Sequence, residues 1–185
     1  MAERIYCFAP FIPSNAQVLI LGSMPSVKSL EQGFYYAHPQ NRFFKIIAVL
    51  HTKWRAQKVG HEVAPSVLSS VPERQAALSD LGIALYDVVA SCEREGSLDI
   101  KIKHYEYADI WGLLQQHPSI KTVITNGGFA KTHFTKSTLK PHQAELNFDF
   151  VALPSTSPAH AVPFATILGQ YEQVLGPLVL GAGLN

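Results

Sequence analysis

The side chains best suited to chemistry lie in one segment, GSMPSVKSLEQGFYYAHPQNRFFK, at residues 22–45. Asn41 stands at the start of NRFFKIIAVL, a run with helical apolar spacing. Its amide oxygen could orient a water molecule, although an amide cannot act as a strong base. The alternative role is a helix N-cap, for which asparagine is a favoured residue. Position alone leaves both roles of Asn41 open.

Other polar side chains follow the remaining apolar runs. Asp87 comes at the end of IALYD, where a desolvated carboxyl group could be protonated and donate a hydrogen bond. A cap of the next turn is the alternative for Asp87. Hydroxyl groups gather in two turn-rich loops, where they and free backbone N–H groups suit a phosphate, although such loops are often only turns. The hydroxyl residues of these loops are Ser23, Ser26, Ser155, Thr156 and Ser157.

Runs typical of buried strands alternate with helical segments along the chain. We expect strands at 17–22, 83–91, 119–127 and 148–154. We expect helices at 41–50, 72–82, 105–116, 129–134 and 164–179. This alternation predicts the α/β class, as a three-layer α/β/α sandwich with a central four-stranded parallel sheet in a single domain over residues 1–185. The functional loops of such a sheet lie at the carboxyl ends of its strands, here 23–40, 87–99, 126–129 and 154–163.

Size and charge set weak limits on the partners of the chain. With 185 residues, of which 47% are apolar, the chain can bury one substantial core. Its net charge of +1 is a weak argument against nucleic-acid binding. Acidic residues are absent, however, between Glu31 and Glu62, between Asp109 and Glu145, and between Asp149 and Glu172. The basic residues of these windows could form one positive face for a polyanion, or ordinary solvated surface.

Cysteine content and hydropathy restrict the class further. Cys7 and Cys92 are too few for a disulfide framework or a four-thiolate metal site, so we expect isolated structural thiols. No apolar run approaches the roughly 20 residues of a membrane-spanning helix, and the start MAERIYCFAP lacks the basic-then-apolar pattern of a signal peptide. We therefore expect a cytoplasmic protein without membrane association.

The segment at 22–45 resembles the first motif of the mismatch-specific branch of the uracil-DNA glycosylase superfamily. That branch combines a Gly-x-Asn-Pro turn after a strand with a later aromatic-Ala-His-Pro-x-Asn-Arg-Phe-Trp stretch. The later stretch is matched here from Tyr36 to Phe43, with Phe44 in place of the tryptophan. The turn has Met24 where the mismatch-specific enzymes place their catalytic asparagine. The hypoxanthine-DNA glycosylase branch instead has Gly-Ser-Met-Pro in the turn, and this sequence is similar to that branch.

The resemblance extends over nearly the whole chain and implies roles for particular residues. Residues 86–99, 125–130 and 153–159 resemble the second-strand region, the third-strand turn and the loop that closes on DNA. Asn41 is implied as the catalytic residue that positions water. Implied substrate contacts are Gly22, Ser23, Met24, Tyr36, His38 and Asp87. Implied DNA contacts are Ser26, Arg42, Ser155, Thr156, Ser157, Pro158 and His160.

Two of these residues have a structural alternative. A flat ring such as that of Tyr36 can stack on an everted base by about 1–3 kcal/mol, but it could equally belong to the core. His38 precedes Pro39, which restricts its backbone to extended conformations and could direct the imidazole toward a pocket. A purely structural histidine is the alternative.

The implied activity is that of a monofunctional DNA glycosylase in base excision repair. Such an enzyme flips a deaminated nucleotide out of DNA and hydrolyses its N-glycosidic bond through an oxocarbenium-like sugar, without metal or cofactor. Deoxyinosine is the expected substrate, with release of hypoxanthine, and we expect a monomer to bind the damaged DNA. The alternatives are a uracil- or mismatch-specific glycosylase and a catalytically inactive lesion-binding module. A prokaryotic source would place the cytoplasmic protein on the nucleoid.

Overall fold

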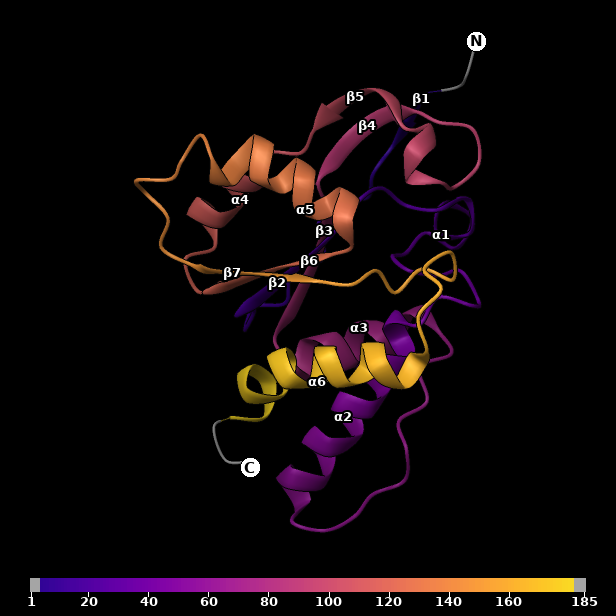
Figure 1. Ribbon diagram of the computed structural model, residues 1–185. Helices are drawn as coiled ribbons and strands as arrows, with labels where there is room; N and C mark the ends of the chain where they lie inside the picture. Colours follow the sequence, from indigo (N-terminus) through magenta and orange to yellow (C-terminus); the bar gives the residue numbers. More distant parts are fainter. Residues whose placement is uncertain (1–3, 182–185) are drawn as a thin grey trace.

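A parallel sheet of four short strands forms the centre of the computed structural model, which describes residues 4–181 (Figure 1). The strands are β2 (Val18–Gly22), β3 (Ile83–Asp87), β6 (Thr122–Asn126) and β7 (Asp149–Leu153). Their order across the sheet is β3-β2-β6-β7, and neighbouring strands are parallel throughout. The predicted α/β/α sandwich with a four-stranded parallel sheet is confirmed.

Strand β2 lies inside the sheet and is buried on both of its faces. Val18 and Ile20 belong to the core cluster on one face, and Leu19 and Leu21 belong to the cluster on the other. Successive side chains of a strand point to opposite faces, so this position requires an apolar residue at every step. Hydrophobic burial on two faces therefore holds β2 at the centre of the domain.

Helices cover the sheet in two layers. The layer shown below the sheet in Figure 1 consists of α2 (Phe43–Val59), α3 (Val71–Asp80) and α6 (Phe164–Leu180). The other face is covered by α4 (Ile110–Gln116) and α5 (Gly128–Phe134), with α5 continuing into the helical segment Thr135–Leu139. Within residues 4–181, none of the helices has the length and hydropathy that a bilayer crossing requires.

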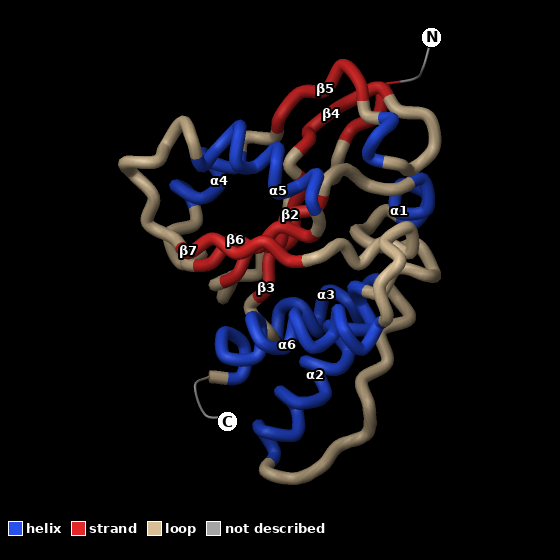
Figure 2. Tube along the Cα trace, viewed as in Figure 1, coloured by secondary structure: helices blue, strands red, loops and turns tan. Residues whose placement is uncertain are grey.

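A second, antiparallel sheet lies beside α5 (Figure 2) and was not predicted. It consists of β1 (Arg4–Tyr6), β4 (Val89–Glu93) and β5 (Lys103–Tyr107), in the order β1-β4-β5. The single strand expected at 83–91 was wrong, because the chain leaves the parallel sheet after Asp87 and enters the second sheet. The helix expected at 105–116 was wrong in its first part, because the alternating segment KHYEY at 103–107 pairs with β4.

Helix α2 is longer than the segment expected at 41–50. The apolar spacing stops after Leu50, but residues that favour helices continue until Gly60 ends the helix in the left-handed conformation, with φ at 76°. Trp54 packs on the core from this extension. The extension runs away from the sheet (Figure 1), so the additional turns affect packing and leave the strand ends unchanged.

The carboxyl ends of the parallel strands bring four chain segments to one edge of the domain. Strand β2 continues into a loop that carries the short helix α1 (Val27–Gln32), and β3 continues toward β4. Strand β6 continues into a turn at Gly127, and β7 continues into the loop at 154–163 before α6. The predicted functional loops therefore lie together.

Candidate active site

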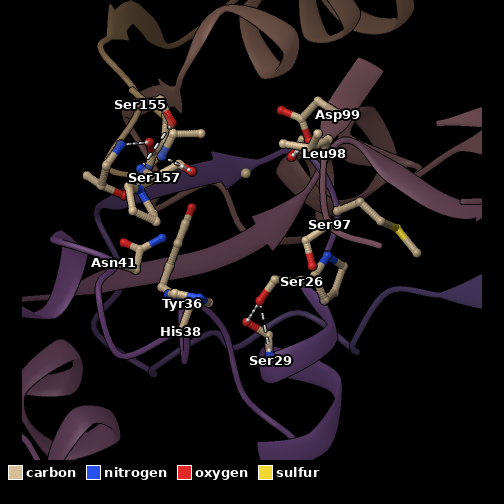
Figure 3. A pocket seen from close by; sticks show the side chains of 18 of the residues that line it. Ser26, Ser29, Tyr36, His38, Asn41, Ser97, Leu98, Asp99, Ser155 and Ser157 are labelled. Atoms are coloured by element: carbon tan, nitrogen blue, oxygen red, sulfur yellow. Dashed lines mark hydrogen bonds between the residues drawn. The ribbon is translucent and has the colours of Figure 1, made fainter. Parts of the chain in front are cut away.

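A cavity of about 510 Å³ opens at the carboxyl edge of the parallel sheet. This volume lies within the roughly 300–1,000 Å³ that is typical of small-molecule sites. Every predicted site residue except Arg42 lines the cavity, and Figure 3 shows several of them approaching it from different segments. The parallel topology therefore gathers residues that are far apart in the sequence.

The floor of the cavity forms where β2 and β3 end side by side. Gly22 and Asp87 are paired across the two strands. A Cβ atom on Gly22 would lie 2.4 Å from Oδ1 of Asp87 and 3.1 Å from the hydroxyl oxygen of Tyr36. Only glycine leaves room at this point for both the carboxyl group and the phenol hydroxyl.

Asp87 and Tyr36 leave polar atoms without partners on this floor. Oδ2 of Asp87 and the hydroxyl oxygen of Tyr36 are both buried and form no hydrogen bond within the protein. Buried polar atoms are almost always paired, and leaving one unpaired costs about 1–3 kcal/mol. A bound molecule that paired with both atoms would remove this cost, so the floor is suited to binding the polar edge of a ring.

Burial raises the pKa of Asp87 to about 7, and the nearby Asp99 acts in the same direction. The guanidinium of Arg94 opposes this shift, and it is itself buried and donates to the carbonyl oxygen of Pro25. A carboxyl group with this pKa is protonated in about half of the molecules at neutral pH. Asp87 can therefore donate a hydrogen bond as well as accept one.

Tyr36 reaches the floor from a strained backbone position. Its φ of 51° lies in the left-handed region, which costs a bulky residue on the order of 1 kcal/mol or more. Its ring packs on Phe43, with 4.1 Å between the ring centroids and 28° between the planes. Stacking of Tyr36 on a base stays a prediction, and the structure adds that its hydroxyl group reaches the floor beside Asp87.

Asn41 lines the cavity next to Tyr36 (Figure 3) and also forms a hydrogen bond with the first residue of α2. Its Oδ1 accepts from the backbone N–H of Phe43 at 2.9 Å. The N-cap of α2 is Arg42, so Asn41 stands one residue before the cap position considered for it. Its bond to Phe43 uses one lone pair of the amide oxygen and orients the side chain. The other lone pair and the amide NH₂ group remain for water or a ligand. The catalytic role of Asn41 stays a prediction.

His38 lines the cavity from the same segment. Its Nδ1 accepts a hydrogen bond from the backbone N–H of Gln40 at 3.2 Å. A neutral imidazole that accepts at Nδ1 carries its proton on Nε2, which leaves Nε2 as a donor. His38 therefore has a structural bond and one free donor at the site.

The position of Arg42 differs from the predicted DNA contact. Its guanidinium donates to the backbone carbonyl oxygens of Thr156, Ser157, His160 and Val162. The backbone N–H of Arg42 also donates to the carbonyl oxygen of Thr156, at 3.1 Å. Because most of its donors are used inside the protein, Arg42 holds the loop after β7 in shape and does not present its guanidinium to DNA.

A second set of hydrogen bonds ties the same loop to β6. Nδ2 of Asn126 donates to Oγ1 of Thr156, and the backbone N–H of Thr156 donates to Oδ1 of Asn126, each at 2.9 Å. Both residues are buried. Thr156 was predicted to contact DNA, but its hydroxyl group belongs to this internal pair. Asn126, which we did not predict as a site residue, lines the cavity and fixes its wall.

The serines predicted at the site line the cavity and also stabilise their own loops. Ser26 caps α1 by accepting from a backbone N–H in the first turn, at 3.1 Å. Ser23 donates to Oδ1 of Asp99 at 2.7 Å. Ser155 and Ser157 each accept from the backbone N–H two residues ahead. These serines therefore stabilise turns, which was the alternative considered for them. The hydroxyl protons of Ser155 and Ser157 remain available to a phosphate oxygen.

Three further predicted residues lie at the boundary of the cavity. Met24 is buried in the core cluster of the α4 and α5 layer and contributes an apolar part of the wall. Pro158 is exposed, and His160 is half-buried, in the loop after β7. This loop is therefore one part of the boundary that is accessible to a large ligand.

The wall opposite the loop after β7 was not predicted in detail. It is formed by Ser97, Leu98, Asp99 and Ile100, in the segment between β4 and β5. Figure 3 labels the first three of these residues. The functional loop predicted at 87–99 includes the first three of these residues, but its end was placed before Ile100, and no role was predicted for any of them. The position of this wall depends on the antiparallel pairing of β4 and β5, which the expected helix at 105–116 had excluded.

The acid-free windows do not form one positive face. Lys53 lies on α2 in one layer and pairs with Glu172 at 2.6 Å. Lys131 lies on α5, in the layer on the other side of the sheet (Figure 1). The basic residues are therefore divided between opposite sides of the molecule.

Metal binding finds no support in the arrangement of side chains. In the part of the chain that the structure describes, no cluster of three or more His, Cys, Asp or Glu residues could hold a metal ion. Cys7 and Cys92 are free thiols. We therefore consider the polar groups of the cavity as hydrogen-bond donors and acceptors, not as metal ligands.

A polar-floored cavity at the carboxyl edge of a parallel sheet covered on both faces defines a ligand-binding α/β domain, and comparison with known proteins gives its family. Residues 9–174 match the model of the uracil DNA glycosylase superfamily. The chain belongs to this superfamily, as its resemblance to the family predicted.

Relatives narrow the comparison further. A hypoxanthine DNA glycosylase of Methanosarcina acetivorans is 29% identical over 154 residues, which cover 83% of this chain and 86% of the relative. A hypoxanthine DNA glycosylase of Methanosarcina barkeri is 32% identical over 120 residues, which cover 65% and 69%. A solution NMR structure from Methanosarcina acetivorans, of a protein named as a candidate uracil DNA glycosylase, matches with a TM-score of 0.70 at 25% identity and covers 95% of this chain and 99% of that chain. These findings confirm the prediction that the protein is a DNA glycosylase.

We expect Arg42→Met to release the loop at 154–163 while leaving the sheet intact. Loss of the bonds from this side chain to the loop carbonyls should lower the free energy of unfolding by about 2–4 kcal/mol. Amide hydrogen exchange, measured by mass spectrometry, should become faster in this loop. Arg42→Lys should have a similar effect, because an ammonium group lacks the planar fork that reaches several carbonyls.

Arg55→Met is the matched control for Arg42→Met. Arg55 lies on the same helix and donates to the carbonyl oxygen of Ala64, away from the cavity. Exchange in the loop at 154–163 should therefore stay at the wild-type rate in this variant. The role of Arg42 would be contradicted if exchange in that loop were the same in Arg42→Met and the wild type.

Proposed function

We propose that this protein is a monofunctional DNA glycosylase that releases hypoxanthine from deoxyinosine in DNA. The observation that carries the proposal is the cavity floor, where Asp87 and Tyr36 line a space large enough for a purine and each has a buried oxygen without a partner. The names of two relatives point to the same base. DNA as the partner follows from the superfamily to which the chain belongs.

The floor is complementary to the edge of a flipped hypoxanthine. That edge carries an N1–H donor next to the O6 acceptor. A protonated Asp87 offers an acceptor and a donor side by side, and the Tyr36 hydroxyl can serve as either. A site whose buried groups pair with the correct base discriminates strongly against a base that leaves them unpaired. A neutral Asp87 also avoids placing a negative charge beside the base as it leaves with the bonding electrons.

Asn41 is proposed to position the water that attacks the sugar. When the bond between C1′ and the base breaks first, the sugar becomes oxocarbenium-like, so the water needs orientation more than it needs a strong base. The hydrogen bond from Phe43 holds the amide in place, and the second lone pair of its oxygen can accept from the water.

The lining of the cavity favours hydrolysis over lyase chemistry. Between positions 4 and 181, none of the residues that line it is a lysine. Attack on the sugar by an amine, with formation of a Schiff base, therefore has no nucleophile in the site. Water is the nucleophile that remains, and the expected products are a free base and an abasic strand.

Assembly and location are part of the same proposal. We expect the protein to act as a monomer. We also expect it to act in the cytoplasm, and on the nucleoid if the organism is prokaryotic, because its substrate is DNA.

A panel of damaged duplexes tests the proposed activity. Duplexes that carry one deoxyinosine, deoxyuridine or deoxyxanthosine are incubated with the protein, treated with alkali and resolved for strand breaks. We expect the fastest breakage at deoxyinosine, and no breakage without alkali. Breaks only at deoxyuridine would replace hypoxanthine by uracil as the released base. No breaks at any lesion would favour an inactive lesion-binding module.

We expect Asn41→Ala to lower the single-turnover rate of base release by about 100-fold or more, because the variant lacks the group that orients water. The lost hydrogen bond to Phe43 should lower the free energy of unfolding by about 1 kcal/mol. The rate is measured from alkali-sensitive breaks in deoxyinosine DNA, and the stability from urea unfolding.

Ser70→Ala separates the loss of stability from catalysis. Ser70 caps α3 in a reciprocal capping box with Glu73 and does not line the cavity. This variant should lose a comparable amount of stability while base release stays unchanged. Hypoxanthine release by Asn41→Ala at the wild-type rate would leave Asn41 with a structural role alone.

The pKa of about 7 for Asp87 predicts that base release slows as the pH rises past neutrality. The protonated carboxyl group donates to the base, whereas the ionised group repels the departing anion. Asp87→Asn keeps a donor and an acceptor but does not titrate, so its rate should lack this decrease between about pH 6 and 9. Single-turnover rates of both proteins across this range provide the measurement. A decrease that persists in Asp87→Asn would have to come from another group.

The same pKa predicts how stability depends on pH. The folded state keeps the Asp87 proton up to about pH 7, whereas the unfolded chain releases it near the ordinary value of 3.8. Stability therefore falls as the pH rises from about 4 to about 7, and Asp87→Asn lacks this loss. The melting temperature of the variant, relative to the wild type, should be higher at pH 8 than at pH 5. An equal difference at both pH values would argue against the raised pKa.

A further inference from the structure

Two large aliphatic side chains stand exposed at the edge of the cavity. Leu98 is 55% exposed and Ile100 is 85% exposed, and both belong to the lining of the cavity. A single exposed apolar residue is common on protein surfaces and needs no explanation. Two of them in one loop at the mouth of a functional cavity indicate a surface that a ligand covers.

The loop that carries these side chains is fixed to the turn after β2. Ser97 Oγ accepts from the backbone N–H of Val27 at 3.0 Å. Asp99 Oδ1 accepts from Ser23 at 2.7 Å, so the acidic side chain between the two aliphatic ones is bound to the protein. Its neighbour Ile100 is left exposed. The apolar pair is therefore presented on a defined support.

Leu98 and the loop after β7 lie on opposite sides of the cavity. Figure 3 shows Leu98 and Asp99 on one side, and Ser155 and Ser157 on the other. The serine side offers hydroxyl groups that suit phosphate oxygens, whereas the other side offers aliphatic carbon that suits the faces of bases. The two edges thus differ in the same way as the backbone and the bases of a DNA strand.

We propose that Leu98 and Ile100 form an apolar edge that packs on the bases next to the flipped nucleotide. The proposal rests on the proposed glycosylase function, because that function makes DNA the ligand at this cavity. Flipping a nucleotide removes stacking from its neighbours. Apolar side chains at an unstacked step offset part of this loss and keep the gap open.

Combined Leu98→Ser and Ile100→Ser substitutions test the proposal, because both side chains are exposed and contribute little to the core. We expect the double variant to release hypoxanthine from a fully paired duplex about 10-fold more slowly under single-turnover conditions. Release from deoxyinosine in a bulge should change little, because a bulged nucleotide is already unstacked. Equal slowing on both substrates, or no slowing on either, would overturn the proposal.

A binding measurement makes the test independent of catalysis. Fluorescence anisotropy compares a duplex containing tetrahydrofuran, a stable abasic analogue, with the same duplex undamaged. The ratio of the affinity for the abasic duplex to the affinity for the undamaged duplex should be about 10-fold lower in the double variant than in the wild type. An unchanged preference would overturn the apolar edge. A lost preference together with a wild-type protein that releases no hypoxanthine would support the edge and overturn the proposed activity.

Val67→Ser is the matched control. Val67 is 71% exposed in the loop between α2 and α3, and it does not line the cavity. Its substitution removes a similar exposed aliphatic side chain, so rates and binding preferences should match those of the wild type. Melting temperatures of all variants close to the wild-type value would show that the effects of the double variant do not come from unfolding.

Discussion

The site depends on the close approach of the Asp87 carboxyl group to Gly22, where two neighbouring strands end. The missing side chain on one strand makes the space that the carboxyl group of the next strand occupies. Tyr36, whose backbone is strained, extends its side chain into the same space. The burial of Asp87 at this point raises its pKa toward neutrality. A steric requirement on one residue thereby sets the protonation state of another, which is the property that the proposed recognition of a base uses.

The start of α2 joins several parts of the site in consecutive residues. Asn41 faces the cavity, and the guanidinium of Arg42 holds the loop that forms one edge of it. Phe43 orients Asn41 through its backbone N–H and supports Tyr36 through its ring. Because these contacts share one helix start, a shift of that start would displace the Asn41 amide, the loop after β7 and the floor together.

Local patterns were sufficient to predict the parallel sheet and the edge at which the cavity forms. Strand β2 shows why, since burial on two faces leaves a continuous apolar run in the sequence. The functional loop predicted at 87–99 includes Leu98, but the antiparallel pairing of β4 and β5 that supports this wall was missed, because these strands show no comparable apolar run. The parts played by Arg42 and Thr156 were also beyond local patterns. A polar side chain can form hydrogen bonds with DNA or with groups of its own protein. The sequence does not show which partner is within reach, because that depends on the folded structure.

The low net charge has a consequence for how the protein selects its target. Basic residues lie on both sides of the sheet, on α2 and on α5, so we expect long-range attraction to undamaged DNA to be weak. Most of the binding free energy then has to arise at the cavity, from hydroxyl groups on one edge, aliphatic carbon on the other and hydrogen bonds on the floor. These contacts form together only when a nucleotide leaves the stack. A deaminated base that pairs weakly leaves more easily, so weak general attraction and strong local complementarity both favour binding at damaged positions.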